Sequence, residues 1–482
     1  MIAGHATLAA VTEPSGPLPP PGNDSFDAGE IARLSGGHLV HDAGRPIRGA
    51  AVDSRRVQPG NLFVALPGER TDGHEHLAEA VANGAAALLV SRPGLPADVT
   101  GSVSVIRVVR PVDGLGAIAA GWRRRFEPLT VGITGSLAKT STKEAVAAVL
   151  AVHFRTLYSE GNENNEIGLP LTVLRLDRGV GALVLEMGMY VGGEIAELAR
   201  IGQPRIGVVT AVQPVHLARI GTIEAVEAAK AELVEALPAN GTAVLNADDE
   251  RVARMAGRTS ARVVTYGFGS GAEVTAGSIE SAGVDGMRFV LRTPAGERAI
   301  GLPSLGRHAV HNALAAAAVG GAAGLDLDEI TTGLAVRPPA THRGDLIRLG
   351  EVTIFDDSYN AAPASMRAAL AVLASLPGRR VAVLGEMLEL GTGHEAGHLE
   401  VGAAAAAVAD LLIVVGPGAE PIGRAARAAG LSPSRVIEVA DRQAALDALL
   451  PRLADNDVVL VKASRGIALD QLIDELRLEL EL

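Results

Sequence analysis

The stretch from Gly132 to Lys143 reads Gly-Ile-Thr-Gly-Ser-Leu-Ala-Lys-Thr-Ser-Thr-Lys, and it lies between a predicted strand and a predicted helix. Such a turn points backbone N–H groups and the positive end of a helix at an anion. Lys139 would reach the β- and γ-phosphates of a nucleotide, and the Thr140 hydroxyl would ligate Mg²⁺. The strict P-loop spacing is missed, and Ala138 stands before the lysine where glycine is usual. An ordinary helix start with a Thr/Ser/Lys first turn is the alternative interpretation.

Strand candidates surround this loop, each a short apolar run. Helical patterns separate the runs, which predicts a parallel sheet covered by helices. A more β-rich stretch at about 262–300 precedes a predicted helix around 311–320. The strand candidates are 129–134, 182–186, 206–212 and 242–246.

Two further α/β regions flank the central one. From Ser25 to about Arg110, short apolar runs such as 62–66 and 85–90 predict a small α/β domain. From near Arg343, strand candidates alternate with Ala- and Leu-rich helical patterns, which predicts a doubly wound sheet. The strand candidates of this last region are 352–355, 380–384, 411–415, 436–439 and 458–461.

We therefore predict an α/β fold of three domains, as the length of 482 residues permits. The start of the chain includes the run Pro17-Leu-Pro-Pro-Pro-Gly22 and has no periodicity, which predicts a disordered tail. The predicted bounds are 1–24 for this tail, 25–112 for the small N-terminal domain, 113–338 for a central P-loop-type domain with a mostly parallel sheet, and 339–482 for a Rossmann-like C-terminal domain.

Composition excludes several classes of function. The net charge of -12 argues against non-specific nucleic-acid binding, which needs a basic face. The chain has no cysteine, which excludes disulfides, thiolate zinc sites and cysteine nucleophiles and fits a reducing cytosol. The sequence contains no uninterrupted run of 18 or more apolar residues, so we do not expect a membrane span. The N-terminus lacks the basic region and apolar run of a secretory signal, so we do not expect one.

The loop at 132–143 resembles the ATP loop of the Mur ligases, which is shorter than the usual P-loop. The resemblance extends over about residues 27–480. It implies a three-domain fold and a cytoplasmic, monomeric enzyme that uses ATP and Mg²⁺ to join a carboxylate to an amine through an acyl phosphate. The other matching segments are 53–66 (Asp-Ser-Arg-Arg-Val-Gln-Pro-Gly-Asn-Leu-Phe-Val-Ala-Leu), 72–74 (Asp-Gly-His), 161–168 (Gly-Asn-Glu-Asn-Asn-Glu-Ile-Gly) and 185–188 (Leu-Glu-Met-Gly).

Within the family, the segments 193–195, 356–363 and 385–391 are most similar to the member that adds D-alanyl-D-alanine. The Asp-Asn-Pro-Arg signature of the diaminopimelate-adding member is absent. The resemblance implies UDP-N-acetylmuramoyl-tripeptide and D-Ala-D-Ala as substrates, in cell-wall precursor synthesis. A related ligase with a different amine substrate, or a catalytically impaired protein that binds UDP-muramoyl peptide, are the alternatives.

The resemblance also implies a metal site. Glu186 ends an apolar strand at the carboxyl edge, where open α/β sheets bind ligands. By resemblance it ligates Mg²⁺, as do Thr140 and His216, and His216 is also a catalytic residue. Without the family, Glu186 would be a solvated acid at the rim of the sheet, and His216 a polar residue of a surface loop.

Lys230 interrupts the apolar stripe of a predicted helix at 222–237. A solvating lysine belongs on the opposite face, with the glutamates of this helix. Its stem could pack on apolar surface while the ammonium snorkels outward. The matching family lysine is carbamylated and ligates a second Mg²⁺. The resemblance therefore implies that Lys230 is carbamylated and that Lys230 and Lys139 are both catalytic.

The remaining predicted site residues rest on the resemblance. Asn312 matches an adenine contact, Arg343 a phosphate contact and Asp357 a ribose contact; otherwise they are a helix residue, a linker charge and a turn former. Lys462 and Arg465 could contact a substrate carboxylate or belong to a capped helix start. The predicted nucleotide loop is Gly135, Ser136, Leu137, Ala138, Lys139, Thr140 and Ser141, and the predicted substrate residues are Ser54, Arg55, Asn164, Asn165, Lys462 and Arg465.

Four alanines depart from the family pattern. Ala138 and Ala463 replace glycines, while Ala211 and Ala362 replace asparagines. A methyl group at position 138 could crowd the phosphate or disfavour a positive φ. Because the charged and metal-binding positions persist, we predict an active enzyme.

Overall fold

The computed structural model describes residues 24–68, 71–94, 101–214, 220–336 and 342–480. The predicted disordered tail lies outside these residues except for Asp24. The chain divides into two compact units, Met1–Ile118 with Leu174–Gly179, and Ala119–Val173 with Val180–Leu482. The second unit contains both the central and the C-terminal sheets. The predicted bounds between domains stay a prediction.

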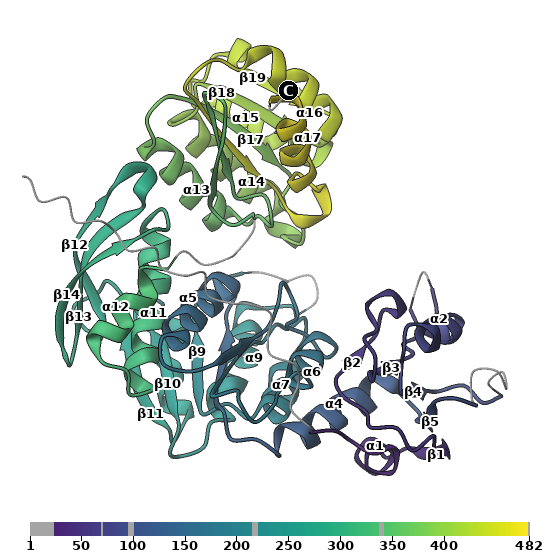
Figure 1. The fold of residues 1–482 in the computed structure, drawn as a ribbon. Coiled ribbons are helices and arrows are strands. Elements are labelled where there is room, and N and C mark those ends of the chain that lie inside the picture. The colour runs from purple at the N-terminus through teal and green to yellow at the C-terminus, as the bar shows by residue number, and fades with distance from the viewer. Residues whose placement is uncertain (1–23, 69–70, 95–100, 215–219, 337–341, 481–482) are drawn as a thin grey trace, which may run out of the picture. The chain divides into compact units, whose positions relative to one another are not determined.

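The N-terminal unit is built on a five-stranded sheet in the order β1-β5-β4-β3-β2, in which only β1 is antiparallel (Figure 1). The apolar runs at 62–66 and 85–90 form its buried middle strands. Its elements are α1 (Ala28–Ser35), β1 (His38–His41), β2 (Ala50–Ala51), β3 (Leu62–Val64), α2 (Leu77–Ala82), β4 (Ala87–Val90) and β5 (Ser104–Arg107), and α4 (Pro111–Arg123) follows.

The central sheet has six parallel strands in the order β11-β10-β9-β6-β8-β7. Alternate residues of β6 face opposite sides: Val131 and Ile133 join the core beneath α5 and α11, while Gly132 faces Leu233 of α9. The elements are β6 (Leu129–Thr134), α5 (Lys139–Ala151), β7 (Thr156–Tyr158), α6 (Gly168–Val173), β8 (Ala182–Glu186), α7 (Glu194–Gly202), β9 (Ile206–Val209), α9 (Ile223–Glu235), β10 (Thr242–Asn246), α10 (Glu250–Arg254) and β11 (Arg262–Tyr266).

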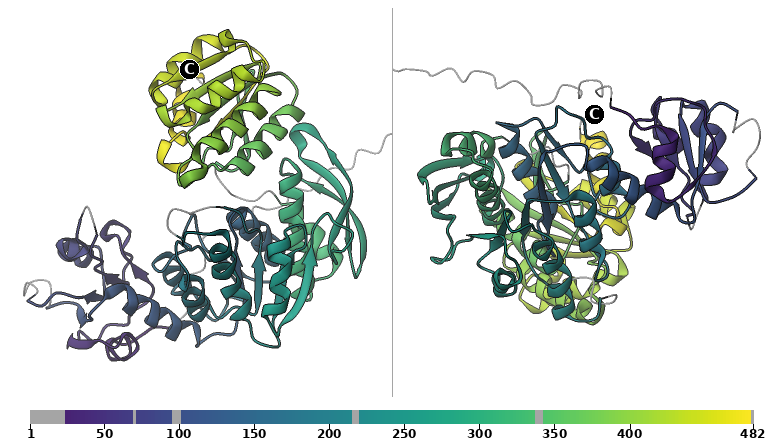
Figure 2. Two further views of the ribbon diagram at one scale, coloured as in Figure 1. Left: turned by 180° about the vertical axis from the view of Figure 1, so that it is seen from behind. Right: turned by 90° about the horizontal axis from the view of Figure 1, so that it is seen from below.

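Most of the predicted β-rich stretch forms a separate antiparallel sheet of three strands, which packs on α11 and α12 (Figure 2). Its first part, Arg262–Tyr266, is instead the edge strand β11 of the central sheet. Apolar residues of β13 and β14, such as Phe289 and Ile300, join the core that includes Val310 and Leu314 of α11. The elements are β12 (Thr275–Ser281), β13 (Met287–Thr293), β14 (Gly296–Leu302), α11 (Arg307–Ala322) and α12 (Leu327–Leu334).

The C-terminal sheet is doubly wound, as predicted, in the order β15-β16-β20-β17-β18-β19. One face packs on α13, α14 and α15, and the other packs on α16 and α17. The elements are β15 (Asp345–Leu349), β16 (Val352–Asp356), α13 (Pro363–Ser375), β17 (Arg379–Gly385), α14 (His394–Ala406), β18 (Leu411–Val415), α15 (Glu420–Ala428), β19 (Val436–Val439), α16 (Arg442–Leu449), β20 (Asp457–Lys462) and α17 (Asp470–Leu480).

Among the described helices, none combines the length and the apolar character that crossing a membrane requires.

Candidate active site

The predicted phosphate loop joins β6 to α5 and is fixed to the end of β9. A Cβ atom on Gly135, whose φ is +152°, would lie 1.8 Å from Thr210 Oγ1, so only glycine fits there. The Ser136 N–H donates to the Ala211 carbonyl over 2.8 Å. The Thr210 hydroxyl donates to the Leu137 carbonyl over 2.6 Å. These two hydrogen bonds fix the loop to the neighbouring strand end, at the start of a helix where an anion could bind.

Ala138 precedes α5 in the left-handed conformation, with φ 64° and ψ 5°. This conformation places the alanine methyl close to the following carbonyl and costs about 1 kcal/mol relative to glycine. Position 138 therefore has the positive φ that favours glycine, although it carries an alanine.

Replacing Ala138 with glycine should raise the free energy of unfolding by up to about 1 kcal/mol, because it relieves this strain. If the methyl also crowds a phosphate, the Michaelis constant for ATP should change. Ala468→Gly is the matched control, since Ala468 is also left-handed, with φ 56°, but lies in the C-terminal domain. A Michaelis constant that does not change in Ala138→Gly would remove the crowding argument.

Lys139, the first residue of α5, donates from Nζ to the Gly135 carbonyl over 2.8 Å. Burial lowers the pKa of its ammonium, the charge of Glu186 opposes that shift, and Arg343 adds to it. Thr140 is buried in the same first turn. A cation and a hydroxyl thus stand at the positive end of α5, as the sequence predicted.

Glu186, the last residue of β8, is 2% exposed. Its Oε1 accepts a hydrogen bond of 2.8 Å from Asn164 Nδ2, while its Oε2 is buried without a partner among the described residues. A buried carboxylate oxygen without a partner is costly. Mg²⁺ prefers oxygen ligands and retains several from water and phosphate, so this carboxylate fits the predicted metal role.

Lys230 lies on α9 and is 2% exposed. Burial lowers its pKa well below the usual value, and the charge of Lys139 lowers it further. No described carboxylate forms an ion pair with it. The snorkelling alternative is wrong, because the whole side chain is enclosed.

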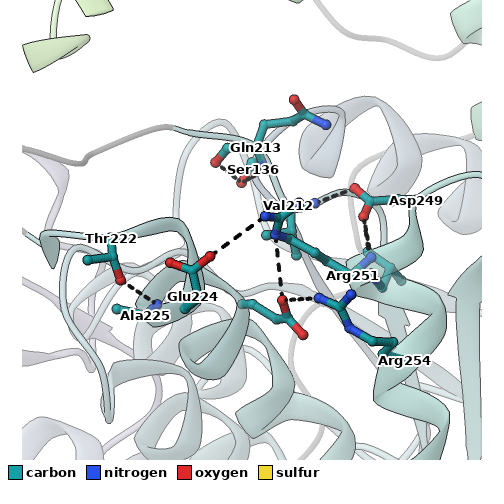
Figure 3. Close-up of polar contacts among 11 residues, drawn as sticks. Ser136, Val212, Gln213, Thr222, Glu224, Ala225, Asp249, Arg251 and Arg254 are labelled. Atoms are coloured by element: carbon teal, nitrogen blue, oxygen red, sulfur yellow. Dashed lines mark hydrogen bonds and ion pairs between the residues drawn. The ribbon is translucent and has the colours of Figure 1, made fainter. Parts of the chain in front are cut away.

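His216 lies outside the described residues, and the described residues on either side of 215–219 are anchored (Figure 3). On one side, Ser136 and Gln213 exchange two hydrogen bonds of 3.1 and 2.9 Å. On the other, Thr222 caps α9, accepting from the Ala225 N–H over 3.2 Å. The described chain before residue 215 is therefore fixed to the phosphate loop, and the described chain after residue 219 leads into the helix that carries Lys230.

A second group of contacts joins the end of β9 and helix α9 to α10 (Figure 3). Asp249 accepts from the N–H groups of Val212 and Arg251 over 2.8 and 3.0 Å, so it ties the end of β9 to the start of α10. Glu227 of α9 pairs with Arg254 over 2.9 Å and with Arg251 over 3.6 Å. These contacts fix α9 against α10 and so help position Lys230.

A cavity lies beside α5. Asn312, which is buried on α11, accepts from the Thr142 hydroxyl over 3.3 Å and faces this cavity. The predicted adenine and phosphate contacts, Asn312 and Arg343, thus line one cavity together with the loop residue Ser141. The polar lining residues are Ser141, Glu144, Ser304, His308, Asn312, Arg343 and Asp345.

Glu144 was not predicted as a site residue. It is buried on α5, and its Oε2 has no partner among the described residues. Burial raises the pKa of this carboxyl to about 7, although the charge of Lys143 opposes the shift. Because the pKa is higher in the folded protein, folding binds a proton between pH 4.5 and about 7. The resulting stability is complete below pH 4.5 and is lost as the pH rises through 7.

We therefore expect the wild-type protein to lose about 2 kcal/mol of stability from this group between pH 5 and pH 8. Glu144→Gln should flatten that part of the stability curve, because glutamine has no proton to lose. Denaturant unfolding at several pH values checks this result. Parallel curves for the two proteins would contradict the assigned pKa.

At the end of β20, the buried Lys462 ammonium contacts Asp357 Oδ2 at 2.6 Å and donates to the carbonyls of Asp357 and Asn360. All three of its donors are used inside the domain. Arg343 stacks 3.9 Å from the centroid of the Tyr359 ring, and Arg465 lies 5.4 Å from it. Arg465 is exposed, so of the two predicted C-terminal substrate residues it is the one with an accessible cation.

The other predicted substrate residues hold local structure. The Ser54 hydroxyl is buried and donates to Glu79 over 2.6 Å. Arg55 pairs in a bidentate manner with Asp53, and this bond lowers the pKa of the Asp53 carboxyl to about 2. Asn165 Oδ1 accepts from the Gly168 N–H at the start of α6. Their contacts with substrate stay predictions, and the structure assigns each a folding role as well.

Comparison with known proteins shows the family to which the fold belongs. The Mur ligase middle domain matches residues 133–320, the Mur ligase glutamate ligase domain 342–465, and the catalytic domain of the Mur ligase family 46–123. A UDP-N-acetylmuramoyl-tripeptide--D-alanyl-D-alanine ligase of Mycobacterium bovis is 40% identical over 489 residues, covering 93% of this chain and 95% of that protein.

Two solved structures are similar over nearly the whole chain. MurF from Acinetobacter baumannii superposes with a TM-score of 0.84 at 29% identity, covering 94% of this chain and 99% of that chain. MurF from Thermotoga maritima, in complex with ADP, superposes with a TM-score of 0.78 at 28% identity, covering 90% and 98%. The three-domain α/β architecture predicted from the sequence is that of these proteins.

Proposed function

This chain belongs to the Mur ligase family, and we propose that it adds D-alanyl-D-alanine to the peptide carboxylate of UDP-N-acetylmuramoyl-tripeptide. It is an ATP-dependent ligase of peptidoglycan precursor synthesis. The observation that carries this function is the near full-length similarity to the UDP-N-acetylmuramoyl-tripeptide--D-alanyl-D-alanine ligase of Mycobacterium bovis and to MurF from Acinetobacter baumannii. In this chain Lys139 lies at the start of α5, after the phosphate loop, and Glu186 lies at the end of β8.

The reaction has two steps. First, an oxygen of the tripeptide carboxylate attacks the γ-phosphorus of ATP, and ADP leaves with the electron pair of the broken P–O bond. Then the dipeptide amine attacks the acyl carbon, phosphate leaves, and the amine gives up a proton. Both partners of the first step are anions, so positive charge and alignment lower its barrier. Lys139 at the loop supplies one such charge.

The residues at the strand ends fit Mg²⁺. Glu186 would hold it through its Oε2, which has no partner among the described residues, and the Thr140 hydroxyl and His216, which follows β9 in the sequence, would complete the protein ligands. When bound, Mg²⁺ neutralises charge between the γ-phosphate and the attacking carboxylate.

We also propose that Lys230 is carbamylated. A buried lysine with a low pKa offers a neutral amine, whose nitrogen bonds to the carbon of CO₂ with release of one proton. The product would be an anionic oxygen ligand in place of a buried neutral amine, so it would suit a second Mg²⁺.

Depleting CO₂ from the assay should therefore lower turnover, and bicarbonate should restore it. Lys230→Arg, which cannot be carbamylated, should have low activity that bicarbonate does not change. A wild-type rate that is the same with and without CO₂ would contradict carbamylation under those conditions.

Release of phosphate from ATP should require both UDP-N-acetylmuramoyl-tripeptide and D-Ala-D-Ala. A catalytically impaired binding protein would instead bind the UDP-linked peptide in calorimetry and show no affinity for ATP. A ligase with another amine substrate would release phosphate with that amine and not with D-Ala-D-Ala. We expect the enzyme to act as a monomer in the cytoplasm, where nucleotide-linked precursors are made.

A further inference from the structure

The chain uses lysine sparingly. Of its 43 Lys and Arg residues only four are lysines, at positions 139, 143, 230 and 462. Lys143, Lys230 and Lys462 are at most 2% exposed, and Lys139 is half-buried. The other 39 basic residues are arginines, which therefore make up the whole basic surface. Each of the four ammonium groups thus belongs to a buried or half-buried residue, where its size and its point charge matter.

Lys143 takes no part in the reaction steps above and, unlike Lys462, has no short contacts for its donors. It lies one turn after Lys139 on α5 and is 0% exposed. Its Nζ makes one long hydrogen bond, of 3.4 Å, to the Gly161 carbonyl. Glu144 Oε1 lies 3.8 Å away, beyond hydrogen-bonding distance, and the Tyr158 ring centroid lies 5.8 Å away. An ammonium has three donors, so this buried cation is poorly satisfied.

Arg123 shows what a structural buried cation looks like in the same unit. It is 6% exposed, and its guanidinium donates to the carbonyls of Gly202 and Phe126 and to the Thr130 hydroxyl, over 2.7 to 3.0 Å. These are short bonds to the framework at the start of the central sheet. Lys143 has nothing comparable, so its burial costs free energy that the fold does not recover.

The surroundings of Lys143 indicate what would satisfy it. Burial lowers the pKa of Lys143, and the charges of Glu186 and Glu144 oppose this shift, yet no ion pair joins Lys143 to Glu186 among the described residues. Gly161, whose carbonyl Lys143 contacts, begins the segment that carries Asn164, the hydrogen-bond partner of Glu186. Lys143 therefore stands near the carboxylate that would hold Mg²⁺, with donors left over for an anion.

We propose that Lys143 Nζ binds the reacting carboxylate of the acceptor peptide and stays bound as that group becomes an acyl phosphate. This inference rests on the proposed function. In the step concerned, a carboxylate oxygen forms a bond to the γ-phosphorus while the bond from that phosphorus to the bridging oxygen of ADP breaks. No proton moves, so the Lys143 ammonium keeps its positive charge and offsets the negative charge of the acceptor carboxylate. Lys139 offsets the negative charge of the nucleotide phosphates.

Lys143→Met and Arg123→Met form a matched pair of buried cation removals. For Lys143→Met we expect phosphate release to fall about 100-fold and the affinity for UDP-N-acetylmuramoyl-tripeptide to fall about tenfold. ATP affinity should stay within about twofold, and the melting temperature at about pH 6 should not fall. For Arg123→Met we expect a lower melting temperature and, per folded molecule, turnover and affinities close to those of the wild type.

Three results would overturn the inference. One is a Lys143→Met protein that melts earlier, as Arg123→Met should, and keeps its turnover, which would make Lys143 structural. Another is a selective loss of ATP affinity, which would assign it to the nucleotide. The third is unchanged acceptor binding and turnover. Calorimetry with the wild-type protein separates this test from the proposed function, because a wild type that does not bind the UDP-linked tripeptide contradicts the proposed function itself.

Discussion

Replacing Lys139 with methionine should reduce ATP-dependent phosphate release by about 1,000-fold or more. Lys139 is the first residue of α5, and its ammonium now donates to the Gly135 carbonyl within the loop. It needs only a change of side-chain conformation to reach an anion at the same helix end. Methionine keeps the length and apolar bulk of the stem, so the loss reports the charge.

The structure explains why this charge should matter more than an ordinary surface charge. Burial lowers the pKa of Lys139, which shows that its surroundings screen charge poorly, and in such a site an ammonium stabilises a phosphate strongly. Arg348→Met is the control, because Arg348 is exposed and pairs only loosely with Glu351. Turnover of the Lys139→Met protein within tenfold of the wild type would contradict the role of the loop.

Replacing Glu186 with glutamine should also reduce turnover by about 1,000-fold. Glutamine retains an oxygen for the Asn164 amide, which now donates to Glu186 Oε1, but it removes the negative charge that would hold Mg²⁺. Because Oε2 is buried without a described partner, the substitution should not destabilise the protein. The melting temperature should stay the same or rise while the activity is lost.

Titration with Mg²⁺ is the measurement that separates a metal role from a structural one. In Glu186→Gln the Mg²⁺ concentration for half-maximal activity should increase at least tenfold. Glu194→Gln is a suitable control. Glu194 is the first residue of α7, and its carboxylate accepts hydrogen bonds from the backbone N–H groups of Tyr190 and Val191, which precede the helix. It should change stability without changing the requirement for Mg²⁺. An unchanged requirement in Glu186→Gln would contradict the metal role.

The strands of the parallel sheets were the most predictable part of the fold. The candidates at 129–134, 182–186 and 242–246 coincide with β6, β8 and β10, because strands buried on both faces are continuous apolar runs. The edge strand β15 was not predicted. It is antiparallel to β16 and only partly buried at Asp345 to Ile347, so its sequence lacks such a run.

The site was predicted unevenly, for physical reasons. The place of Lys139 follows from the loop pattern, whereas the metal role of Glu186 was implied by the family resemblance and stays a prediction. Lys143 and Glu144 were missed because nothing in a helical pattern reveals that two adjacent charged residues are both buried. Side-chain partners are also invisible in the sequence. The buried ion pair of Lys462 with Asp357 therefore appears only in the structure.

The most direct test of the central claim follows an oxygen atom. UDP-N-acetylmuramoyl-tripeptide labelled with ¹⁸O in its reacting carboxylate is incubated with the enzyme, ATP, Mg²⁺ and D-Ala-D-Ala, and the released phosphate is analysed by mass spectrometry. A carboxylate that attacks the γ-phosphorus leaves its oxygen on phosphate when the amine displaces it, so the phosphate should carry ¹⁸O in proportion to the pentapeptide formed. Unlabelled phosphate released together with pentapeptide would contradict the acyl-phosphate mechanism.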